Sequence, residues 1–353
     1  MSTGPDQPLR YADAGVDIDA AEATVARYGE IARRTQRPEV LGSLGSFAGL
    51  FRLQGYRDPV LASSTDSVGT KVLVAAAAGR FDTVGQDLVN HCVNDILTTG
   101  AQPLFFLDDL ATADLPQAQR VEIVAGIGLA CEENGVALIG GETADLPDLY
   151  RTGDYDIAGF IVGAVERDAV IDGARIRAGD VLVALPSSGL HTNGYSLVRA
   201  AFGLAKGADA AHDRAVLDTA YAELGGTLGD ALLAVHRSYL GALEPLLPRI
   251  HGWAHITGGG IPGNLPRILP EGLGAFIDAG SWRTPPLFAV IQRQGRVADG
   301  EMYRTFNMGV GAILAVAAED APGVLAALPE AWALGAVEAQ AAGVSVVRGL
   351  PLA

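Results

Sequence analysis

Three carboxylates in the first half of the chain stand beside apolar segments that a charged side chain normally avoids. Asp66 follows an apolar strand, Asp95 lies in an otherwise apolar helix, and Glu142 follows the paired glycines Gly140 and Gly141. A carboxylate buried without a partner is costly in free energy. Magnesium takes oxygen ligands and usually binds through a few carboxylates together with substrate phosphates. We therefore predict a shared Mg2+ site at Asp66, Asp95 and Glu142, the alternative being that each residue caps a helix or closes a turn.

One face of the helix expected at residues 82–99 carries only short polar side chains. Its members share helical spacings of three, four, seven and eight residues: Asp87, Asn90, His91, Asn94 and Asp95. The stripe lacks the Lys, Glu and Arg that are usual on a solvated helix face. The stripe therefore either faces a ligand or is exposed to solvent.

Glycine-rich loops offer close backbone approach to anions. The candidates are residues 42–49, 140–141, 187–194 and 258–260. The loop at 187–194 joins a strand to a helix, so its N–H groups would cradle a phosphate or simply make an ordinary strand-to-helix connection. Residues 258–263 match the spacing GxGxxG, but the prolines that follow break a long helix and exclude a dinucleotide fold.

The elements that must position these residues alternate between strand and helix. Helices are expected at 20–34, 82–99 and 115–134, and strands at 59–64, 104–107, 136–139 and 157–165. A boundary near residue 170 precedes further strands at 181–185, 309–316 and 343–347, with a helix beginning at Tyr195 and others between 227 and 247. This alternation predicts an α/β (α+β) protein of two domains.

Composition narrows the class of partner. The formal net charge is -16, without a Lys/Arg run, so nucleic acid is excluded as a partner. Cys92 and Cys131 are isolated and predict neither a disulfide framework nor a zinc site. The apolar runs are too short to span a membrane, and the N-terminus lacks a signal pattern. The expected location is the cytoplasm.

Several segments together resemble the phosphoribosylformylglycinamidine cyclo-ligase family, also called aminoimidazole ribonucleotide synthetase. They run in order from residue 11 to about residue 316: YADAGVDID at 11–19, RPEV at 37–40, TDSVGTK at 65–71, VND at 93–95, PLFFLD at 103–108, GGETA at 140–144, SSGLHTNGYS at 187–196, TGGG at 257–260 and EMYRTFN at 301–307.

The resemblance implies a two-domain fold shared by a superfamily of ATP-using enzymes. The polar, glycine- and proline-containing start of the chain predicts a flexible tail at residues 1–10. By the resemblance, residues 11–170 would form a domain that binds ATP and Mg2+ and builds a β-barrel across a dimer interface. Residues 171–353 form an α/β substrate domain. The expected assembly is a homodimer, and K+ is an additional candidate cation.

The resemblance also implies residue roles. The catalytic candidates are Lys71, Asp95 and His191. The ATP and metal candidates are Gly42, Gly45, Ser46, Asp66, Thr70, Lys71, Asn94, Asp95, Gly140, Gly141 and Glu142. Lys71 would neutralise phosphate charge, the alternative being a solvated lysine after a turn. The substrate candidates are Ser188, Gly189, His191, Asn193, Gly258, Gly259, Gly260, Arg304 and Asn307.

The implied reaction converts formylglycinamidine ribonucleotide and ATP to 5-aminoimidazole ribonucleotide, ADP and phosphate. Phosphorylation of the formyl oxygen makes it a good leaving group, and a nitrogen of the same substrate then closes the ring. Alternatives are a thiamine phosphate kinase of the same superfamily, or a nucleotide-binding regulator without turnover.

The chain departs from the family pattern at two positions. Gly29 stands where some relatives carry Lys, and Met308 where some carry Cys, which excludes a catalytic thiol there. Two other superfamily members need a reactive cysteine, one in the N-terminal glycine loop and one at the C-terminus. Here no Cys precedes Cys92, and the sequence ends with residues 349–353.

Overall fold

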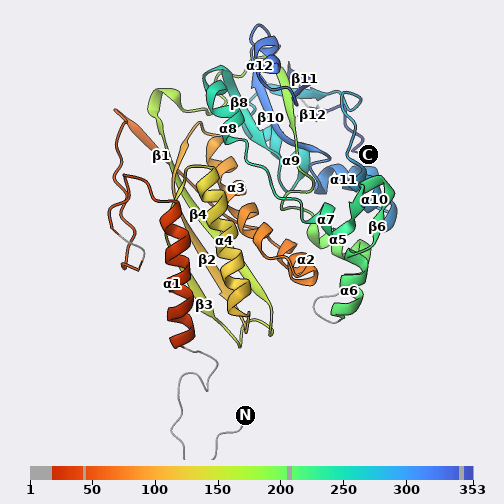
Figure 1. The fold of residues 1–353 in the computed structure, drawn as a ribbon. Helices are drawn as coiled ribbons and strands as arrows, with labels where there is room; N and C mark the ends of the chain where they lie inside the picture. Colours follow the sequence, from red (N-terminus) through yellow and green to blue (C-terminus); the bar gives the residue numbers. More distant parts are fainter. Residues whose placement is uncertain (1–17, 43–44, 205–208, 342–345, 353) are drawn as a thin grey trace, which may run out of the picture.

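The computed structural model describes residues 18–42, 45–204, 209–341 and 346–352 (Figure 1). The expected tail at 1–10 and nearly all of the 11–19 motif lie outside these residues, as does most of the strand expected at 343–347. No helix in the described ranges is long and apolar enough to cross a membrane.

The first half of the chain forms a four-stranded sheet in the order β1-β4-β2-β3. These strands are β1 (Pro59–Ser67), β2 (Gln102–Thr112), β3 (Ala137–Asp145) and β4 (Tyr155–Glu166). β4 runs antiparallel to β1 and β2, whereas β2 and β3 are parallel. The sheet is packed on one side by helices (Figure 1), namely α1 (Ile18–Arg34), α3 (Asp82–Leu97) and α4 (Gln117–Glu133), with the short α2 (Lys71–Ala78) beside them.

Two glycines set the distance between α3 and α4. A Cβ on Gly85 would lie 2.2 Å from the carbonyl oxygen of Ile123, and one on Gly126 would lie 2.0 Å from that of Asp82. No side chain fits at either position, so the helices pack backbone to backbone. This close packing leaves α3 buried on nearly every side.

The second half of the chain builds a six-stranded sheet in the order β12-β9-β11-β5-β10-β8. All its neighbours are antiparallel except β12 and β9. The strands are β5 (Val181–Pro186), β8 (Ile250–His255), β9 (Leu273–Ile277), β10 (Val310–Val316), β11 (Trp332–Ala339) and β12 (Val347–Arg348).

Short helices surround this second sheet. They are α5 (Tyr195–Phe202), α6 (Ala210–Leu217), α7 (Leu228–Leu232), α8 (Leu240–Leu243), α9 (Gly260–Asn264), α10 (Pro286–Gly295), α11 (Asp299–Thr305) and α12 (Ala321–Ala327). A two-stranded hairpin, β6 (Ala220–Tyr221) and β7 (Gly226–Thr227), completes the regular pairing. α9 has only five residues, which agrees with the exclusion of a dinucleotide-binding helix after the glycines at 258–260.

All four strands of the first sheet are longer than the sequence predicts, and this changes the setting of the carboxylates. Asp66 lies within β1, opposite Gly159, rather than after the strand. Gly140, Gly141 and Glu142 belong to β3 and not to a turn. The parallel pairing with β2 continues through them, with Asp108 opposite Gly141 and extended backbone on both strands. The prediction of a glycine turn at 140–141 is therefore wrong.

Candidate active site

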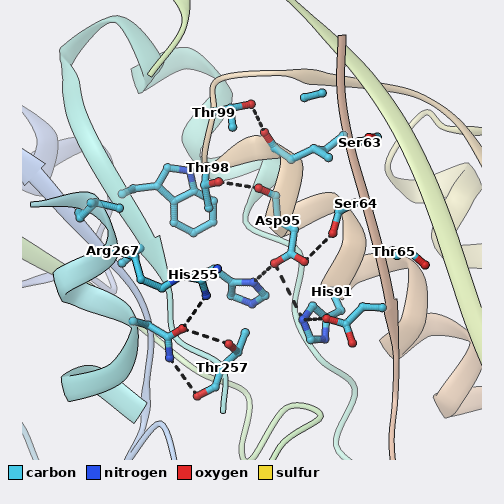
Figure 2. A pocket seen from close by; sticks show the side chains of 17 residues that line it. Ser63, Ser64, Thr65, His91, Asp95, Thr98, Thr99, His255, Thr257 and Arg267 are labelled. Atoms are coloured by element: carbon cyan, nitrogen blue, oxygen red, sulfur yellow. Dashed lines mark hydrogen bonds and ion pairs between the residues drawn. The ribbon is translucent and has the colours of Figure 1, made fainter. Parts of the chain in front are cut away.

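A cavity of about 530 Å3 lies between the two halves of the chain. Its lining from the first half comes from β1, α3 and the turn after α3, and its lining from the second half comes from β8, the following loop and the 3-10 turn at Leu265–Ile268 (Figure 2). The lining residues that carry polar side chains are Ser63, Ser64, Thr65, Asp66, His91, Asp95, Thr98, Thr99, Trp253, His255, Thr257, Asn264 and Arg267. Two of the predicted metal ligands, Asp66 and Asp95, therefore share one polar cavity.

Asp66 and Asp95 meet the imidazole of His91 at the wall of the cavity. The alternation of β1 points Asp66 toward α3, where His91 and Asp95 lie one helical turn apart. Nε2 of His91 is 3.0 Å from Oδ2 of Asp66 and 3.9 Å from Oδ1 of Asp95. Burial disfavours charge on His91, but its hydrogen bond to Asp66 and the charges of Asp95 and Asp66 prevail and raise its pKa. His91 therefore offers partial positive charge to both carboxylates.

Asp95 also meets a histidine from the other half of the chain. Nδ1 of His255 lies 2.9 Å from Oδ1 of Asp95, and Ser64 donates to Oδ2 at 2.9 Å. Burial alone would raise the pKa of Asp95, but these hydrogen bonds and the nearby imidazoles lower it below its usual value. Because Nδ1 of His255 faces a carboxylate, it carries a proton, and Nε2 is left to accept a hydrogen bond.

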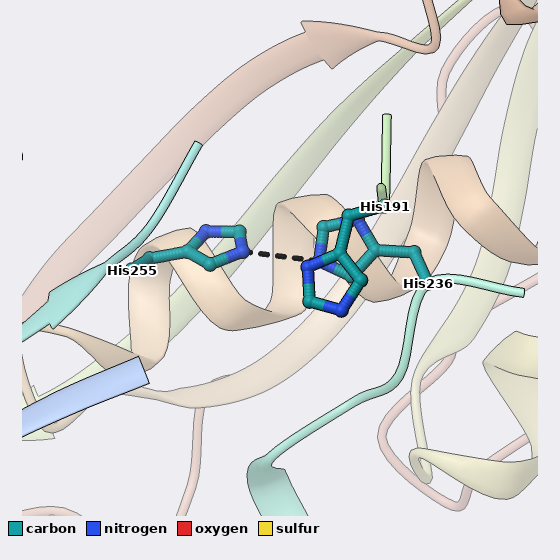
Figure 3. Close-up of side chains that lie close together, drawn as sticks. All are labelled: His191, His236 and His255. Atoms are coloured by element: carbon teal, nitrogen blue, oxygen red, sulfur yellow. Dashed lines mark hydrogen bonds between the residues drawn. The ribbon is translucent and has the colours of Figure 1, made fainter. Parts of the chain in front are cut away.

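The hydrogen-bonded chain continues from His255 into the protein. Nε2 of His236 lies 3.0 Å from Nε2 of His255 and 3.3 Å from Nδ2 of Asn94. The ring of His236 stacks on His191, with centroids 3.8 Å apart and planes within 12° (Figure 3). Burial lowers the pKa of both stacked histidines well below the usual value. Both rings are therefore neutral.

A buried ion pair supports these histidines from behind. Nζ of Lys71 lies 2.7 Å from Oδ2 of Asp87, with both side chains fully buried. Lys71 also donates to the carbonyl oxygens of His191, at 3.1 Å, and Ala234, at 2.9 Å. Oδ1 of Asp87 accepts from the backbone N–H of His236 at 2.7 Å. We call this cluster, made of Lys71, Asp87, Asn94, His191 and His236, the domain junction.

The domain junction explains the polar stripe on α3. Asp87, Asn90, His91 and Asn94 are all buried, so the stripe is not a wet surface. Asn94 accepts from the backbone N–H of Tyr239 and donates to the carbonyl of Arg237. Of the stripe, only His91 and Asp95 face the cavity. The interpretation of Lys71 as a solvated lysine is wrong. As placed, its ammonium has three protein partners and does not line the cavity, so its contact with phosphate stays a prediction.

A second hollow, of about 320 Å3, lies on the first domain near α1 and β3. It is lined by predicted ATP-binding residues, namely Gly45, Ser46, Gly140, Gly141 and Glu142. Within one chain Glu142 is thus separated from Asp66 and Asp95, because β4 and β2 stand between β1 and β3. Asp108 also lines this hollow, and burial raises its pKa to about 7. A three-carboxylate site does not form in the single chain.

None of the predicted substrate residues, all of which are among the described residues, lines this cavity. Asn307 is buried and fastens the 187–189 turn through hydrogen bonds with Ser187 and the carbonyl of Gly189. Ser188 is bonded to the carbonyl of Val235 and donates its N–H to His191. Asn193 is close to Gly258, and the next two residues, Gly259 and Gly260, lead into α9. Arg304 is exposed on α11. Thr70 contacts Ser196, and Gly42 has a φ of 121°.

The cavity contains functional candidates that the sequence did not reveal. His255 belongs to none of the sequence motifs, and His251, four residues earlier, is bonded to Asp180 instead. Arg267 belongs to none of the sequence motifs either. Both residues become recognisable only when the two domains dock.

Comparisons with known proteins identify the family. Models of AIR synthase related protein match twice, the N-terminal domain at residues 45–165 and the C-terminal domain at 177–348. The phosphoribosylformylglycinamidine cyclo-ligase of Anaeromyxobacter dehalogenans (strain 2CP-C) is 51% identical over 340 residues, covering 94% of this chain and 96% of that protein. The chain belongs to this cyclo-ligase family.

Other cyclo-ligases agree. The protein of the same name from Desulfitobacterium hafniense (strain DSM 10664 / DCB-2) is 50% identical over 343 residues, covering 95% of this chain and 98% of the relative. That from Xanthomonas euvesicatoria pv. vesicatoria (strain 85-10) is 52% identical over 318 residues, covering 89% and 91%.

Solved structures share the two-domain cyclo-ligase fold. Hydrogenase maturation protein HypE in complex with ATP has a TM-score of 0.64 at 19% identity, covering 90% of this chain and 88% of its own. Thiamine-monophosphate kinase from Stenotrophomonas maltophilia K279a has a TM-score of 0.63 at 18% identity, covering 90% and 94%. The α/β architecture expected from the sequence is confirmed.

Proposed function

We propose that this chain uses ATP to cyclise formylglycinamidine ribonucleotide to 5-aminoimidazole ribonucleotide in purine biosynthesis, with release of ADP and phosphate. The observation that carries this proposal is identity of about half over 94% of the chain to proteins named for that reaction. The polar cavity between the domains supports it, because two carboxylates and two imidazoles converge there.

The chemistry needs activation of an amide oxygen. The γ-phosphoryl group of ATP is transferred to the formyl oxygen, and a nitrogen of the same open-chain substrate attacks the activated carbon. This forms the ring, and the carbon–oxygen bond breaks to release inorganic phosphate and one proton. Phosphoryl transfer depends mostly on positioning and charge stabilisation. The ring closure is intramolecular, and holding the chain bent supplies up to about 7–11 kcal/mol. A cavity shared by two domains suits both demands.

Asp66 and Asp95 suit a magnesium ion. Both present carboxylate oxygens to the cavity, and Mg2+ commonly binds one or two carboxylates while substrate phosphates and water complete its shell. Asp66 and Asp95 would hold the ion, which neutralises phosphate charge when bound. The predicted third ligand, Glu142, lies in the other hollow and would contribute only from another chain. The contribution of K+ is measured by comparing turnover with and without this ion.

Homodimerisation is part of the proposal. The sheet of the first domain is packed by helices on one side only (Figure 1), and its other side exposes Leu61 (60%) and Phe160 (42%). These residues lie on the neighbouring strands β1 and β4. An exposed apolar sheet face is typical of a surface covered in the assembled protein. We therefore propose that two copies close a barrel through this face.

The cytoplasm remains the proposed location. Cys92 and Cys131 are buried free thiols, as is usual in a reducing compartment.

A turnover assay tests the function. Purified protein, ATP, Mg2+ and the ribonucleotide should yield one ADP and one phosphate per ring formed, with and without K+. Asp95→Asn should lower kcat on the order of 100-fold or more, because it removes a charge that acts on the phosphoryl group. Asp218→Asn, in an exposed pair with Arg214, is the matched control and should retain full activity.

The same assay separates the alternatives. ADP formation with thiamine monophosphate but not with the ribonucleotide would favour the kinase. Nucleotide binding without turnover of either substrate would favour the regulator. Normal activity of Asp95→Asn would refute the metal assignment.

A further inference from the structure

The two sides of the cavity between the domains carry side chains of opposite charge. Asp66 and Asp95 stand on the side contributed by β1 and α3. Arg267 stands on the side contributed by the second domain, and it is the only Lys or Arg among the described lining residues. Figure 2 shows Arg267 on the opposite side of His255 from His91 and Thr65. The cavity therefore offers a site for a cation and, separately, a site for an anion.

Arg267 is exposed, and its guanidinium makes one hydrogen bond to the described residues without being neutralised. Its Nη1 donates to Oδ1 of Asn264 at 3.3 Å. No carboxylate of the described residues forms an ion pair with it, although the protein has a net charge of -16 and exposed arginines elsewhere pair with acids. Four of its five donors thus have no protein acceptor in the described structure, which suits a bidentate anion.

Asn264 fixes this arginine to the glycine turn. Its side chain is only 3% exposed. Nδ2 donates to the carbonyl oxygens of Gly258, at 3.2 Å, and Gly260, at 2.9 Å, while Oδ1 accepts from Oγ1 of Thr257 at 3.2 Å. One buried amide therefore links the 257–260 turn, the floor of the cavity and Arg267. Such built support is typical of a binding group that must keep its position.

We propose that Arg267 binds the 5′-phosphate of the ribonucleotide substrate, while the opposite side of the cavity receives the magnesium and phosphates of ATP. This inference rests on the proposed function. A phosphate monoester is tetrahedral, and two of its terminal oxygens can accept the two parallel N–H bonds that one guanidinium offers. The reacting part of the substrate, between its phosphate and ATP, then lies beside Asp95 and His255. Arg304, predicted from the resemblance to face this cleft, does not line it.

Steady-state kinetics of Arg267→Ala test the proposal. The KM for the ribonucleotide should rise about 10- to 100-fold, the loss expected for charge-assisted hydrogen bonds. The KM for ATP should stay within about twofold of wild type. Arg267→Lys should lie between the two, since it keeps the charge and loses the fork. Arg293→Ala, which removes an exposed pair with Glu223, is the control and should match wild type.

A second experiment replaces the ribonucleotide with the ribonucleoside that lacks its 5′-phosphate. Wild type and Arg267→Ala should use this poor substrate with equal kcat/KM, because the group that Arg267 binds is missing. An equal penalty on nucleoside and nucleotide would show that Arg267 only maintains the architecture. A rise in the KM for ATP in place of that for the ribonucleotide would assign the arginine to the nucleotide phosphates. Either result, or an unchanged KM for the ribonucleotide, overturns the proposal.

Calorimetry separates this inference from the proposed function, because it needs no turnover. Ribose 5-phosphate should bind wild type and Arg293→Ala measurably and Arg267→Ala at least about tenfold more weakly, and plain ribose should not distinguish the three. Loss of this difference overturns the anchor even in an active enzyme. If wild type forms no product yet shows the difference, the proposed reaction fails and the phosphate site stands.

Discussion

The ion pair in the domain junction allows a quantitative test of what holds the two domains together. Lys71 and Asp87 both come from the first domain, on α2 and α3. Their remaining hydrogen bonds go to the backbone of the second domain, at His191, Ala234 and His236. Removing one charge therefore leaves the other fully buried and also weakens the contact between domains.

Asp87→Asn should cost about 3–5 kcal/mol, the usual effect of removing one partner from a buried pair. That is a large part of the roughly 5–15 kcal/mol that stabilises a typical domain. Lys71→Met should have a similar effect, because it leaves Asp87 without its ammonium. The double variant Lys71→Met/Asp87→Leu should cost clearly less than the sum of the single losses, by at least about 1 kcal/mol, since no charge is stranded.

Urea unfolding followed by circular dichroism and tryptophan fluorescence measures these differences. The exposed pair of Arg214 and Asp218 provides the control, since Asp218→Asn should change stability by about 1 kcal/mol or less. Single losses below about 1 kcal/mol, or a double variant whose loss equals the sum, would refute the reasoning.

The pH dependence of Asp87→Asn supplies an independent check. Burial lowers the pKa of Lys71, and Asp87 opposes this effect in the native protein. Without Asp87, the folded pKa falls further below the unfolded value near 10.5. The folded state then binds the proton less tightly than the unfolded state, so stability should rise as pH increases toward that value. The deficit of Asp87→Asn relative to wild type should therefore shrink as the pH rises toward that value. A constant deficit would contradict a stranded ammonium.

Four further outcomes are expected. Gly141→Ala should lose stability and ATP affinity, because a Cβ there would lie 2.3 Å from Oδ1 of Asp108, and thermal melting with nucleotide titration measures both. Asp108→Asn should gain melting temperature over wild type from pH 5 to pH 8, since burial raises the native pKa to about 7 and ionising the buried acid destabilises the fold as pH rises. The wild type should lose stability as pH falls below about 6.5, because buried His191 and His236 have lowered pKa values and only the unfolded chain takes up those protons readily; His191→Gln should flatten that slope in melts at pH 7 to 5. Gly29→Ala should stabilise α1 by about 0.5–1 kcal/mol in urea unfolding, since no atom lies within 4 Å of the added Cβ.

Local pattern predicted the three long helices of the first domain well, whereas most of the short helices were not predicted. The helix expected at 82–99 is α3 at Asp82–Leu97, and that expected at 20–34 is α1 at Ile18–Arg34. Strand ends were predicted less well, because pairing with a neighbour extended β3 through two glycines that read locally as a turn. Tertiary pairing outweighs residue preference at such positions.

The candidate site was predictable only in part. Asp66 and Asp95 stood out because carboxylates are unusual beside apolar segments, and they do share a cavity. Lys71 belongs to the 65–71 motif and Asp87 to the polar stripe on α3, but nothing in their spacing indicates that they pair. His255 and Arg267 belong to the site only through the docking of the second domain, which no periodicity along the chain encodes. Glu142 is the opposite case: its carboxylate suits a metal ion, but it lies on β3, which is separated from β1 by two strands.

The contact between Asp95 and His255 joins residues 160 positions apart along the chain. At roughly 5–20 residues per second, a ribosome needs about 10–30 s to travel from one to the other. During that interval the nascent first domain carries its two acidic groups but lacks the imidazole and the arginine that complete the chamber. The cavity between the domains therefore forms only after residues 255 and 267 of the second domain have been synthesised, and a half-made polypeptide lacks it.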